Sequence, residues 1–272
     1  IRISVRLGAC LGWLLWLLLP RRRTIVQKNL IVISRFLGKR GLSGVVQPSV
    51  RDVFMRAGAN LLGGFAFNRM SAEEAEKHLL VEGIEDLQHA LADGRGVIIL
   101  LAHMGPWEAL AQFPEIARRL NVGASFGALY RPFNNHSLDN WYKRRREARG
   151  TRLFSRRDGF HKPVDFIRSG GMLGILADQK MRQGETVSFF GENASTTSIP
   201  GLFQRRSGAP VLSVSLSTMG TALWRIRFRR INLTALQGDT SRAVAATLCN
   251  QALAASLCDS LSDGFWFQDR FL

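Results

Sequence analysis

Short, continuous apolar runs alternate with helical patterns along most of this chain, and this alternation restricts the fold more than any other feature. The apolar runs cover residues 97–102, 123–130, 172–177 and 211–216, and the helical patterns between them cover residues 107–120, 138–149 and 164–169. A strand that is apolar on both faces is typical of a parallel sheet covered by helices. We therefore expect an α/β fold, with a mixed, largely parallel sheet and helices on both faces.

The flanking regions extend this pattern. Residues 224–230 (WRIRFRR) alternate apolar and basic side chains, which predicts an edge strand with one solvated face. Residues 24–37, 50–67 and 243–261 have the mixed pattern of helices. A chain of 272 residues that is 46% hydrophobic can bury one sizeable core. We expect one domain over residues 24–272, preceded by a separate segment over residues 1–23.

The first segment has the composition of a membrane-associating helix. Residues 7–19 (LGACLGWLLWLLL) are apolar and are followed by Pro20 and three arginines. At about 1.5 Å per residue this run is too short to cross a hydrocarbon core of about 30 Å. Trp13, Trp16 and the arginines suit a helix in the membrane interface. A signal peptide and a buried core helix are the alternatives. The first residue is not methionine, so a longer span also stays open.

The formal charge of +16 favours an anionic partner, such as nucleic acid, an acidic membrane surface or a phosphorylated substrate. Basic runs lie at residues 143–146, 156–157, 205–206 and 225–230. No nucleic-acid-binding motif accompanies them and aromatic residues are not interleaved with them, so we expect no nucleic-acid partner. The three cysteines are too few for a disulfide framework and lack the spacing of a zinc site.

The most informative stretch joins a buried strand to a helix at a histidine. The strand ends at His103, Gly105 suits an N-cap, and Pro106 suits the first helical position, so Glu108 falls in the first turn. From there Glu108 can reach the His103 ring, at the strand end where ligands gather in open α/β sheets. A histidine held by a carboxylate, with no protein nucleophile beside it, suits removal of a proton from a substrate hydroxyl. On spacing alone, a structural, hydrogen-bonded histidine fits equally well.

His103, four intervening residues and Glu108 resemble the His-x4-Asp/Glu motif of glycerolipid-type acyltransferases. Other blocks, in the same order, are similar to the bacterial lipid A biosynthesis (lauroyl/myristoyl) acyltransferases. These blocks are residues 18–23 (LLPRRR) with Asn29-Leu30, residues 129–132 (LYRP) with Asn134-Asn135, residues 174–179 (GILADQ), residues 189–191 (FFG) with Thr196-Thr197, and residues 208–211 (GAPV). The likeness covers nearly the whole chain. It departs at residues 265–272 (FWFQDRFL), where the family commonly has Trp-x-Trp and a basic tail.

The resemblance implies a glycerolipid acyltransferase-like fold and an enzyme on the cytoplasmic face of the inner membrane. It would move an acyl chain from an acyl thioester, on an acyl carrier protein or coenzyme A, to a hydroxyl of a glycolipid such as a lipid A precursor. No metal or cofactor is implied. His103 would be the general base and Glu108 its orienting partner. Substrate-binding roles would fall to Arg131, Asn134, Asp178 and Gln179.

Individual roles follow from that likeness, and each has a plain alternative. Arg131 would hold a substrate phosphate or a developing oxyanion, or else be a solvated surface charge. Asp178 and Gln179 would shape the pocket beside the histidine, and Asp178 would otherwise cap a helix or a turn.

A second hypothesis rests on residues 123–127 (GASFG), which fit the Gly-x-Ser-x-Gly pattern of serine hydrolases. A nucleophile elbow requires the serine between a strand and a following helix, whereas Ser125 begins or precedes a predicted strand. A non-catalytic protein that binds membranes or nucleic acid is a third possibility, but it leaves the His103–Glu108 arrangement without a purpose.

Overall fold

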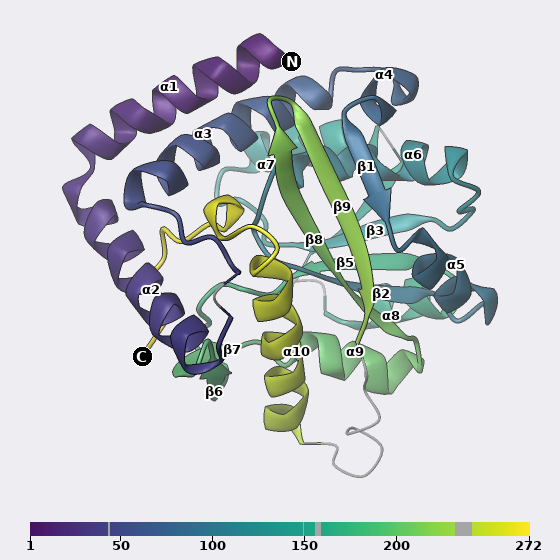
Figure 1. Cartoon of the computed structure of the whole chain (residues 1–272). Helices are drawn as coiled ribbons and strands as arrows, with labels where there is room; N and C mark the ends of the chain where they lie inside the picture. Colours follow the sequence, from purple (N-terminus) through teal and green to yellow (C-terminus); the bar gives the residue numbers. More distant parts are fainter. Residues whose placement is uncertain (43, 149, 156–158, 232–240) are drawn as a thin grey trace.

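The computed structural model describes residues 1–42, 44–148, 150–155, 159–231 and 241–272. Its centre is a seven-stranded sheet with the strand order β1-β9-β8-β2-β5-β3-β4 (Figure 1). The strands are β1 (Leu79–Glu82), β2 (Val97–Leu101), β3 (Phe126–Tyr130), β4 (Thr151–Ser155), β5 (Met172–Leu176), β8 (Val211–Gly220) and β9 (Leu223–Arg230). A separate hairpin joins β6 (Glu185–Phe189) to β7 (Glu192–Thr196).

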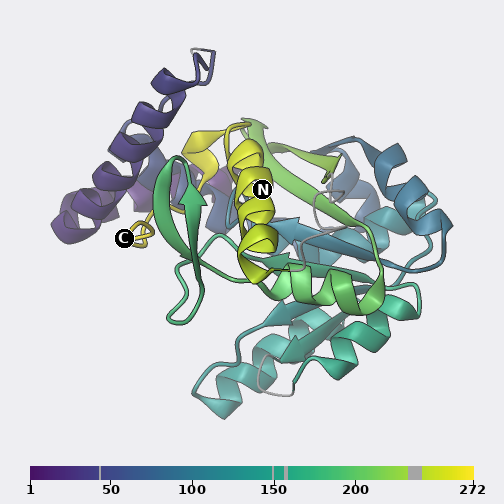
Figure 2. The same ribbon diagram turned by 90° about the horizontal axis from the view of Figure 1, so that it is seen from below.

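Only β8 and β9 pair antiparallel in this sheet, and the other described pairs are parallel. All five residues of β2 are buried, so both faces of the sheet are covered at its centre. Figures 1 and 2 show helices on both sides. The predicted α/β class is confirmed. The helices that follow the first two are α3 (Val50–Phe67), α4 (Ala72–Glu76), α5 (Ile84–Ala92), η1 (Trp107–Gln112), α6 (Phe113–Arg119), α7 (His136–Glu147), α8 (His161–Arg168), α9 (Ile199–Ser207), α10 (Arg242–Leu257) and η4 (Leu261–Asp263).

The prediction of an edge strand over residues 224–230 is wrong. Strand β9 lies between β1 and β8, and β1 is at the edge. Alternation reports that one face is polar, but it does not report whether the backbone edges are paired. The polar face is neutralised by nearby acids, through the pairs Arg225–Glu82, Arg227–Glu82, Arg227–Asp259, Arg229–Asp259 and Arg230–Asp86. The basic run at residues 156–157 lies outside the described residues.

The turn after β2 also differs from expectation. The helix begins with the 3-10 turn η1, whose N-cap is Pro106 rather than Gly105. Gly105 has φ +59°, and a Cβ there would lie 2.1 Å from the carbonyl oxygen of Leu216. Only glycine fits this left-handed, crowded position without strain. The turn therefore lies directly against β8, and this fixes the direction in which the chain leaves His103.

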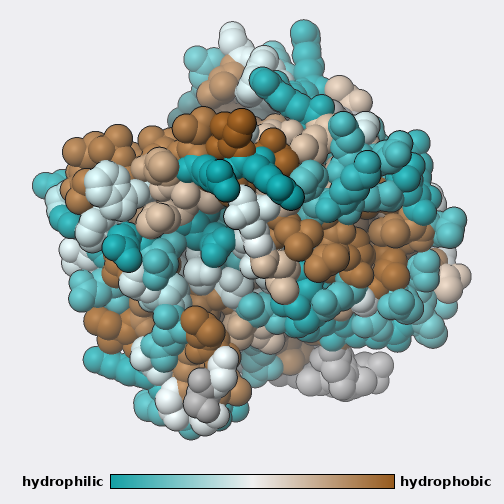
Figure 3. Space-filling view, turned by 45° about the horizontal axis from the view of Figure 1, so that its top comes forward, coloured by the Kyte–Doolittle hydropathy of each residue, from teal (hydrophilic) through white to brown (hydrophobic). Residues whose placement is uncertain are grey.

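Helices α1 (Arg2–Leu18) and α2 (Pro20–Lys39) meet at a bend of 100°. No single helix in the described part of the chain has the length and apolar character to cross a membrane, although the bent pair passes that test together. The outer side of α1 exposes large apolar side chains, among them Ile3, Leu7, Leu14 and Leu18. Figure 3 shows hydrophobic patches bordered by hydrophilic side chains on this part of the molecule. The predicted boundary between residues 23 and 24 falls inside α2.

The inner side of α1 packs backbone to backbone against α3, as Figure 1 shows. Gly8 and Gly12 are the buried residues of α1. A Cβ at Gly12 would lie 2.2 Å from the carbonyl oxygen of Phe54, and one at Gly58 would lie 2.1 Å from that of Gly8. Small residues four apart permit this close approach of two helices.

Helix α2 is fastened to residues 263–272, far along the sequence. The side-chain amide of Asn29, which is 1% exposed, donates to the carbonyls of Trp266 (2.9 Å) and Gln268 (2.7 Å). Arg22 donates to the carbonyl of Phe267 (2.9 Å). Figures 1 and 2 show this segment beside α2 and the β6–β7 hairpin.

Replacing Gly58 with alanine should lower the free energy of unfolding by about 1 to 3 kcal/mol, because the added methyl group forces α1 away from α3. Urea denaturation followed by circular dichroism measures this change. Gly38→Ala is the matched control. It adds the same methyl group to α2 in open space and should stabilise the helix by about 0.5 to 1 kcal/mol. Equal stability of the two variants would contradict the proposed packing.

Candidate active site

The register of two neighbouring strands brings a histidine and an aspartate together. Strands β2 and β5 are parallel, and Leu101 pairs with Leu176. Two residues further along each strand lie His103 and Asp178. The His103 Nδ1 atom lies 2.6 Å from Asp178 Oδ1, and the His103 backbone N–H donates to Oδ2 at 3.0 Å. The two side chains are 17% and 10% exposed, so this pair is largely shielded from solvent.

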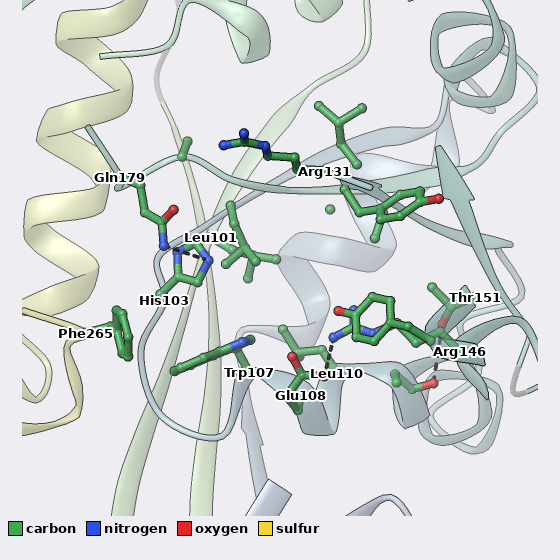
Figure 4. Close-up of a pocket in the computed structure, with 18 of the residues that line it drawn as sticks. Leu101, His103, Trp107, Glu108, Leu110, Arg131, Arg146, Thr151, Gln179 and Phe265 are labelled. Atoms are coloured by element: carbon green, nitrogen blue, oxygen red, sulfur yellow. Dashed lines mark hydrogen bonds and ion pairs between the residues drawn. The ribbon is translucent and has the colours of Figure 1, made fainter. Parts of the chain in front are cut away.

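These contacts determine the tautomer of the imidazole. A carboxylate accepts hydrogen bonds, so Nδ1 carries the proton and Nε2 retains its lone pair. The Nε2 atom faces the pocket and lies 3.4 Å from the side-chain nitrogen of Gln179, as Figure 4 shows. A neutral histidine oriented in this way can accept a proton at Nε2 while Asp178 stabilises the resulting imidazolium.

Glu108 has a different partner from the one the sequence suggested. Its carboxylate forms an ion pair with Arg146 of α7, and Figure 4 shows it directed toward that side chain. The Arg146 guanidinium also lies over the ring of Tyr142, 4.6 Å from its centre, and burial raises the pKa of Tyr142 to about 12. The prediction that Glu108 contacts the His103 ring is therefore wrong. Asp178 is the hydrogen-bond partner of His103 Nδ1, and Glu108 pairs instead with Arg146, whose side chain is always charged.

These groups surround a pocket of about 430 Å³. Its polar lining includes His103, Glu108, Arg131, Arg146 and Gln179, and its apolar wall includes Leu101, Leu110, Ala128 and Leu129. A pocket of this size, mostly apolar with a few converging polar groups, is typical of a small-molecule or lipid-chain site. The part of the chain that the structure describes places no serine or cysteine in this lining.

Several predicted site residues meet here, and one does not. Arg131 follows β3, is exposed, and lines the pocket, as does Gln179 after β5. Asp178 lies behind the imidazole rather than in the lining. Asn134 is exposed in the loop before α7 and is not among the lining residues. The sequence did not indicate Arg146. It is the one residue of the basic run 143–146 that lines the pocket, and nothing in the sequence distinguishes it from the other three.

Residues 263–272 form hydrogen bonds with the backbone of His103 and of the turn after it. The backbone N–H of Phe265 donates to the carbonyl of His103 (2.8 Å), and that of Gly105 donates to the carbonyl of Asp263 (3.0 Å). The ring of Trp107 packs edge-on against both His103 and Phe265, with ring centres 5.5 and 5.6 Å apart. The backbone of His103 is therefore hydrogen-bonded to Asp178 through its N–H and to this later segment through its carbonyl.

Ser125 lies at the opposite end of the sheet from His103. It is an exposed residue just before β3, and its carbonyl accepts a hydrogen bond from Met172 (2.8 Å). Since β2, β5 and β3 are parallel, Ser125 is at the amino end, level with Gly96, and His103 is at the carboxyl end, roughly 23 Å away along the strand direction. A strand, not a helix, follows Ser125. This geometry is unsuitable for a nucleophile elbow. Among the described residues, no group of three or more His, Cys, Asp or Glu side chains is arranged to hold a metal.

Comparison with known proteins shows the family of the chain. The chain is 23% identical over 269 residues to the lipid A biosynthesis palmitoleoyltransferase of Escherichia coli (strain K12), covering 97% of this chain and 83% of that protein. The same figures hold for the lipid A biosynthesis acyltransferase of Shigella flexneri. A sequence model of the bacterial lipid A biosynthesis acyltransferases matches residues 1–272. The chain therefore belongs to that family and is an acyltransferase.

Proposed function

We propose that this acyltransferase moves a fatty acyl chain from an acyl thioester, on an acyl carrier protein or coenzyme A, to a hydroxyl of a lipid A precursor. The observation that carries the proposal is the His103–Asp178 pair, whose Nε2 faces a partly apolar pocket beside Gln179. The absence of serine and cysteine from the described lining favours direct transfer between two bound substrates. The names of the E. coli and S. flexneri relatives support a lipid A-type acceptor.

In the proposed reaction, His103 Nε2 removes the proton from the acceptor hydroxyl as its oxygen attacks the thioester carbonyl carbon. Asp178, hydrogen-bonded to Nδ1, stabilises the imidazolium that forms. The tetrahedral intermediate then expels the sulfur as its bond to carbon breaks, and Nε2 returns the proton to the leaving thiol. The ester is formed, the thiol is released, and His103 is again neutral.

The other polar groups have substrate-positioning roles in this proposal. Arg131 is exposed at the pocket, where a forked guanidinium suits a phosphate of a substrate. Asn134, exposed three residues later and outside the pocket lining, would contact the part of the substrate that extends beyond the pocket. Gln179 lies close enough to Nε2 to direct the acceptor hydroxyl toward it. Glu108, fixed by Arg146, accepts hydrogen bonds from the acceptor instead of orienting the histidine.

His103→Ala should reduce acyl transfer by at least about 100-fold, because it removes the base. Asp178→Asn should cause a comparable loss, because an amide can favour the wrong tautomer. Ser125→Ala, at the opposite end of the sheet, should retain wild-type activity. The measurement is transfer of a labelled acyl chain from a thioester to a lipid A precursor. Full activity of His103→Ala, or loss only in Ser125→Ala, would reject the mechanism.

The Glu108–Arg146 pair is largely buried, so removal of one partner should cost more stability than removal of both. In a double-mutant cycle with Glu108→Gln and Arg146→Met, we expect a coupling energy of about 1 to 3 kcal/mol. Thermal unfolding of the four proteins provides this value. Strictly additive effects would mean that the two side chains do not stabilise each other.

We further propose that α1 and the arginines after it attach the enzyme to the cytoplasmic face of the inner membrane. The exposed apolar side of α1 supplies the surface that would enter the bilayer. Residues 21–23 and Arg2 and Arg6 supply positive charge for anionic lipid headgroups. The bend at Leu19 lets α1 lie along a surface while α2 turns away from it.

Replacing Leu7 and Leu14 with glutamate should lower partitioning into vesicles of anionic phospholipid by roughly 100-fold or more, because each buried leucine contributes about 1.5 to 3 kcal/mol. Vesicle cosedimentation measures this partitioning. Leu80→Glu on β1 is the control, since Leu80 is 46% exposed and Leu14 is 45% exposed. If the control and the α1 variants lose binding equally, α1 is not the attachment site.

A further inference from the structure

A buried acid, Asp263, joins three elements that are far apart in the sequence. It is the last residue of η4 and is 4% exposed. Its Oδ2 atom accepts the backbone N–H of Thr218 on β8 (2.7 Å). Its Oδ1 atom accepts the side-chain amide of Asn60 on α3 (2.6 Å) and the hydroxyl of Thr218 (2.6 Å). Arg56, also on α3, lies 3.9 Å from Oδ1. These donors and the nearby cation compensate the desolvation of the carboxylate.

The groups around this carboxylate require an acceptor at both of its oxygens. The indole Nε1 of Trp224 can only donate, and it donates to the amide oxygen of Asn60 (3.1 Å). The amide nitrogen of Asn60 is therefore the atom that faces Asp263. The other oxygen meets the backbone N–H of Thr218, which is also a donor. An amide at position 263 would place its own N–H2 group against one of these donors.

The unequal lengths of β2 and β8 explain the position of Asp263. Strand β8 has ten residues, but β2 pairs only with residues 211–214 of it. Beyond that point β8 continues alongside the turn that follows β2, where Gly105 lies against the carbonyl of Leu216. The N–H of Thr218, two residues further along β8, is bound by Asp263. The carboxylate thus attaches η4 to β8 next to the turn that carries His103.

The backbone that follows this carboxylate holds the same turn directly. The carbonyl of Asp263 accepts the N–H of Gly105 (3.0 Å), and the N–H of Phe265 donates to the carbonyl of His103 (2.8 Å). On its other side, the N–H of His103 donates to Asp178 (3.0 Å). An unbroken series of hydrogen bonds therefore runs from α3 and β8, through the side chain and backbone of one residue, to the backbone on both sides of the His103 ring.

We propose that Asp263 is a positioning residue for His103. Its carboxylate fixes residues 263–265 to β8 and α3, and these residues fix the His103 backbone so that Nε2 points into the pocket. The inference rests on the proposed function, in which Nε2 is the base. Without the carboxylate, the His103 carbonyl loses a fixed donor and the ring can move away from the acceptor hydroxyl. A displacement of about 1 Å in a reacting group can reduce the rate by about 100-fold.

The first test is Asp263→Asn, which keeps the shape of the side chain and removes one acceptor. The kcat for acyl transfer should fall roughly 10- to 100-fold, because the base is misplaced. The KM for the thioester should be almost unchanged, because the side chain lies outside the pocket lining. The NMR resonances of the His103 ring protons should shift or split, because the ring no longer occupies one position.

Asp259→Asn is the matched control, four residues earlier in the chain. Among the described residues, the carboxylate of Asp259 binds Ser215 on β8 and Arg227 and Arg229 on β9, and not the turn after β2. The same change of acid to amide should therefore lower the unfolding temperature of the enzyme and leave kcat and the His103 resonances as in the wild type. This comparison separates the loss of a buried carboxylate from the loss of His103 positioning.

Thr218→Val provides a milder variant, because it removes the hydroxyl bond to Asp263 and keeps the backbone bond. Its kcat should fall by a smaller factor, roughly 2- to 10-fold. If Asp263→Asn does not fold, this variant decides the question, and wild-type kcat in Thr218→Val would then overturn the inference.

For a folded Asp263→Asn, wild-type kcat or unmoved His103 resonances would overturn the inference. Equal losses of kcat in Asp263→Asn and Asp259→Asn would also overturn it, because they indicate only a structural role. His103→Ala in the same assay identifies a failure of the proposed function. If His103→Ala is inactive while Asp263→Asn is fully active, only the role of Asp263 is rejected. If His103→Ala is active, the proposed function itself is rejected.

Discussion

The parallel register between β2 and β5 determines which side chains meet at the proposed catalytic centre. Leu101 opposite Leu176 places His103 opposite Asp178, because both chains continue in the same direction beyond the last paired residues. A shift of one residue in either strand would turn one of the two side chains toward the other face of the sheet. The buried, entirely apolar sequence of β2 makes the register dependent on packing from both faces. The packing of the core therefore determines the geometry of the candidate active site.

The sequence predicts the elements of this core well and their lateral arrangement poorly. The apolar runs locate β2, β3, β5 and β8 within a few residues, because a strand buried on both faces has a distinctive composition. The edge position assigned to β9 fails, because arginines that pair with Glu82 and Asp259 look the same in sequence as arginines in solvent. Which strands are neighbours depends on long-range packing that no local pattern records.

In the candidate site, too, the individual residues are predictable from the sequence and their contacts are not. His103 and Asp178 are each predictable as residues at strand ends, but their contact depends on the strand order and register. The 3-10 turn that carries Glu108 directs it toward α7, and only the tertiary structure identifies Arg146 as the residue that receives it. Local spacing can place a carboxylate near a histidine. It cannot determine which of two nearby carboxylates the histidine binds when a competing arginine comes from 38 residues away.

The clamp between Asn29 and the carbonyls of Trp266 and Gln268 joins residues that are 237 and 239 positions apart. A ribosome adds about 5 to 20 residues per second, so the two sides of this clamp leave it at times separated by tens of seconds. Throughout that interval α1 and α2 exist without the segment that braces the His103 backbone. The order of synthesis therefore delays completion of the candidate active site until the late segment has closed over α2.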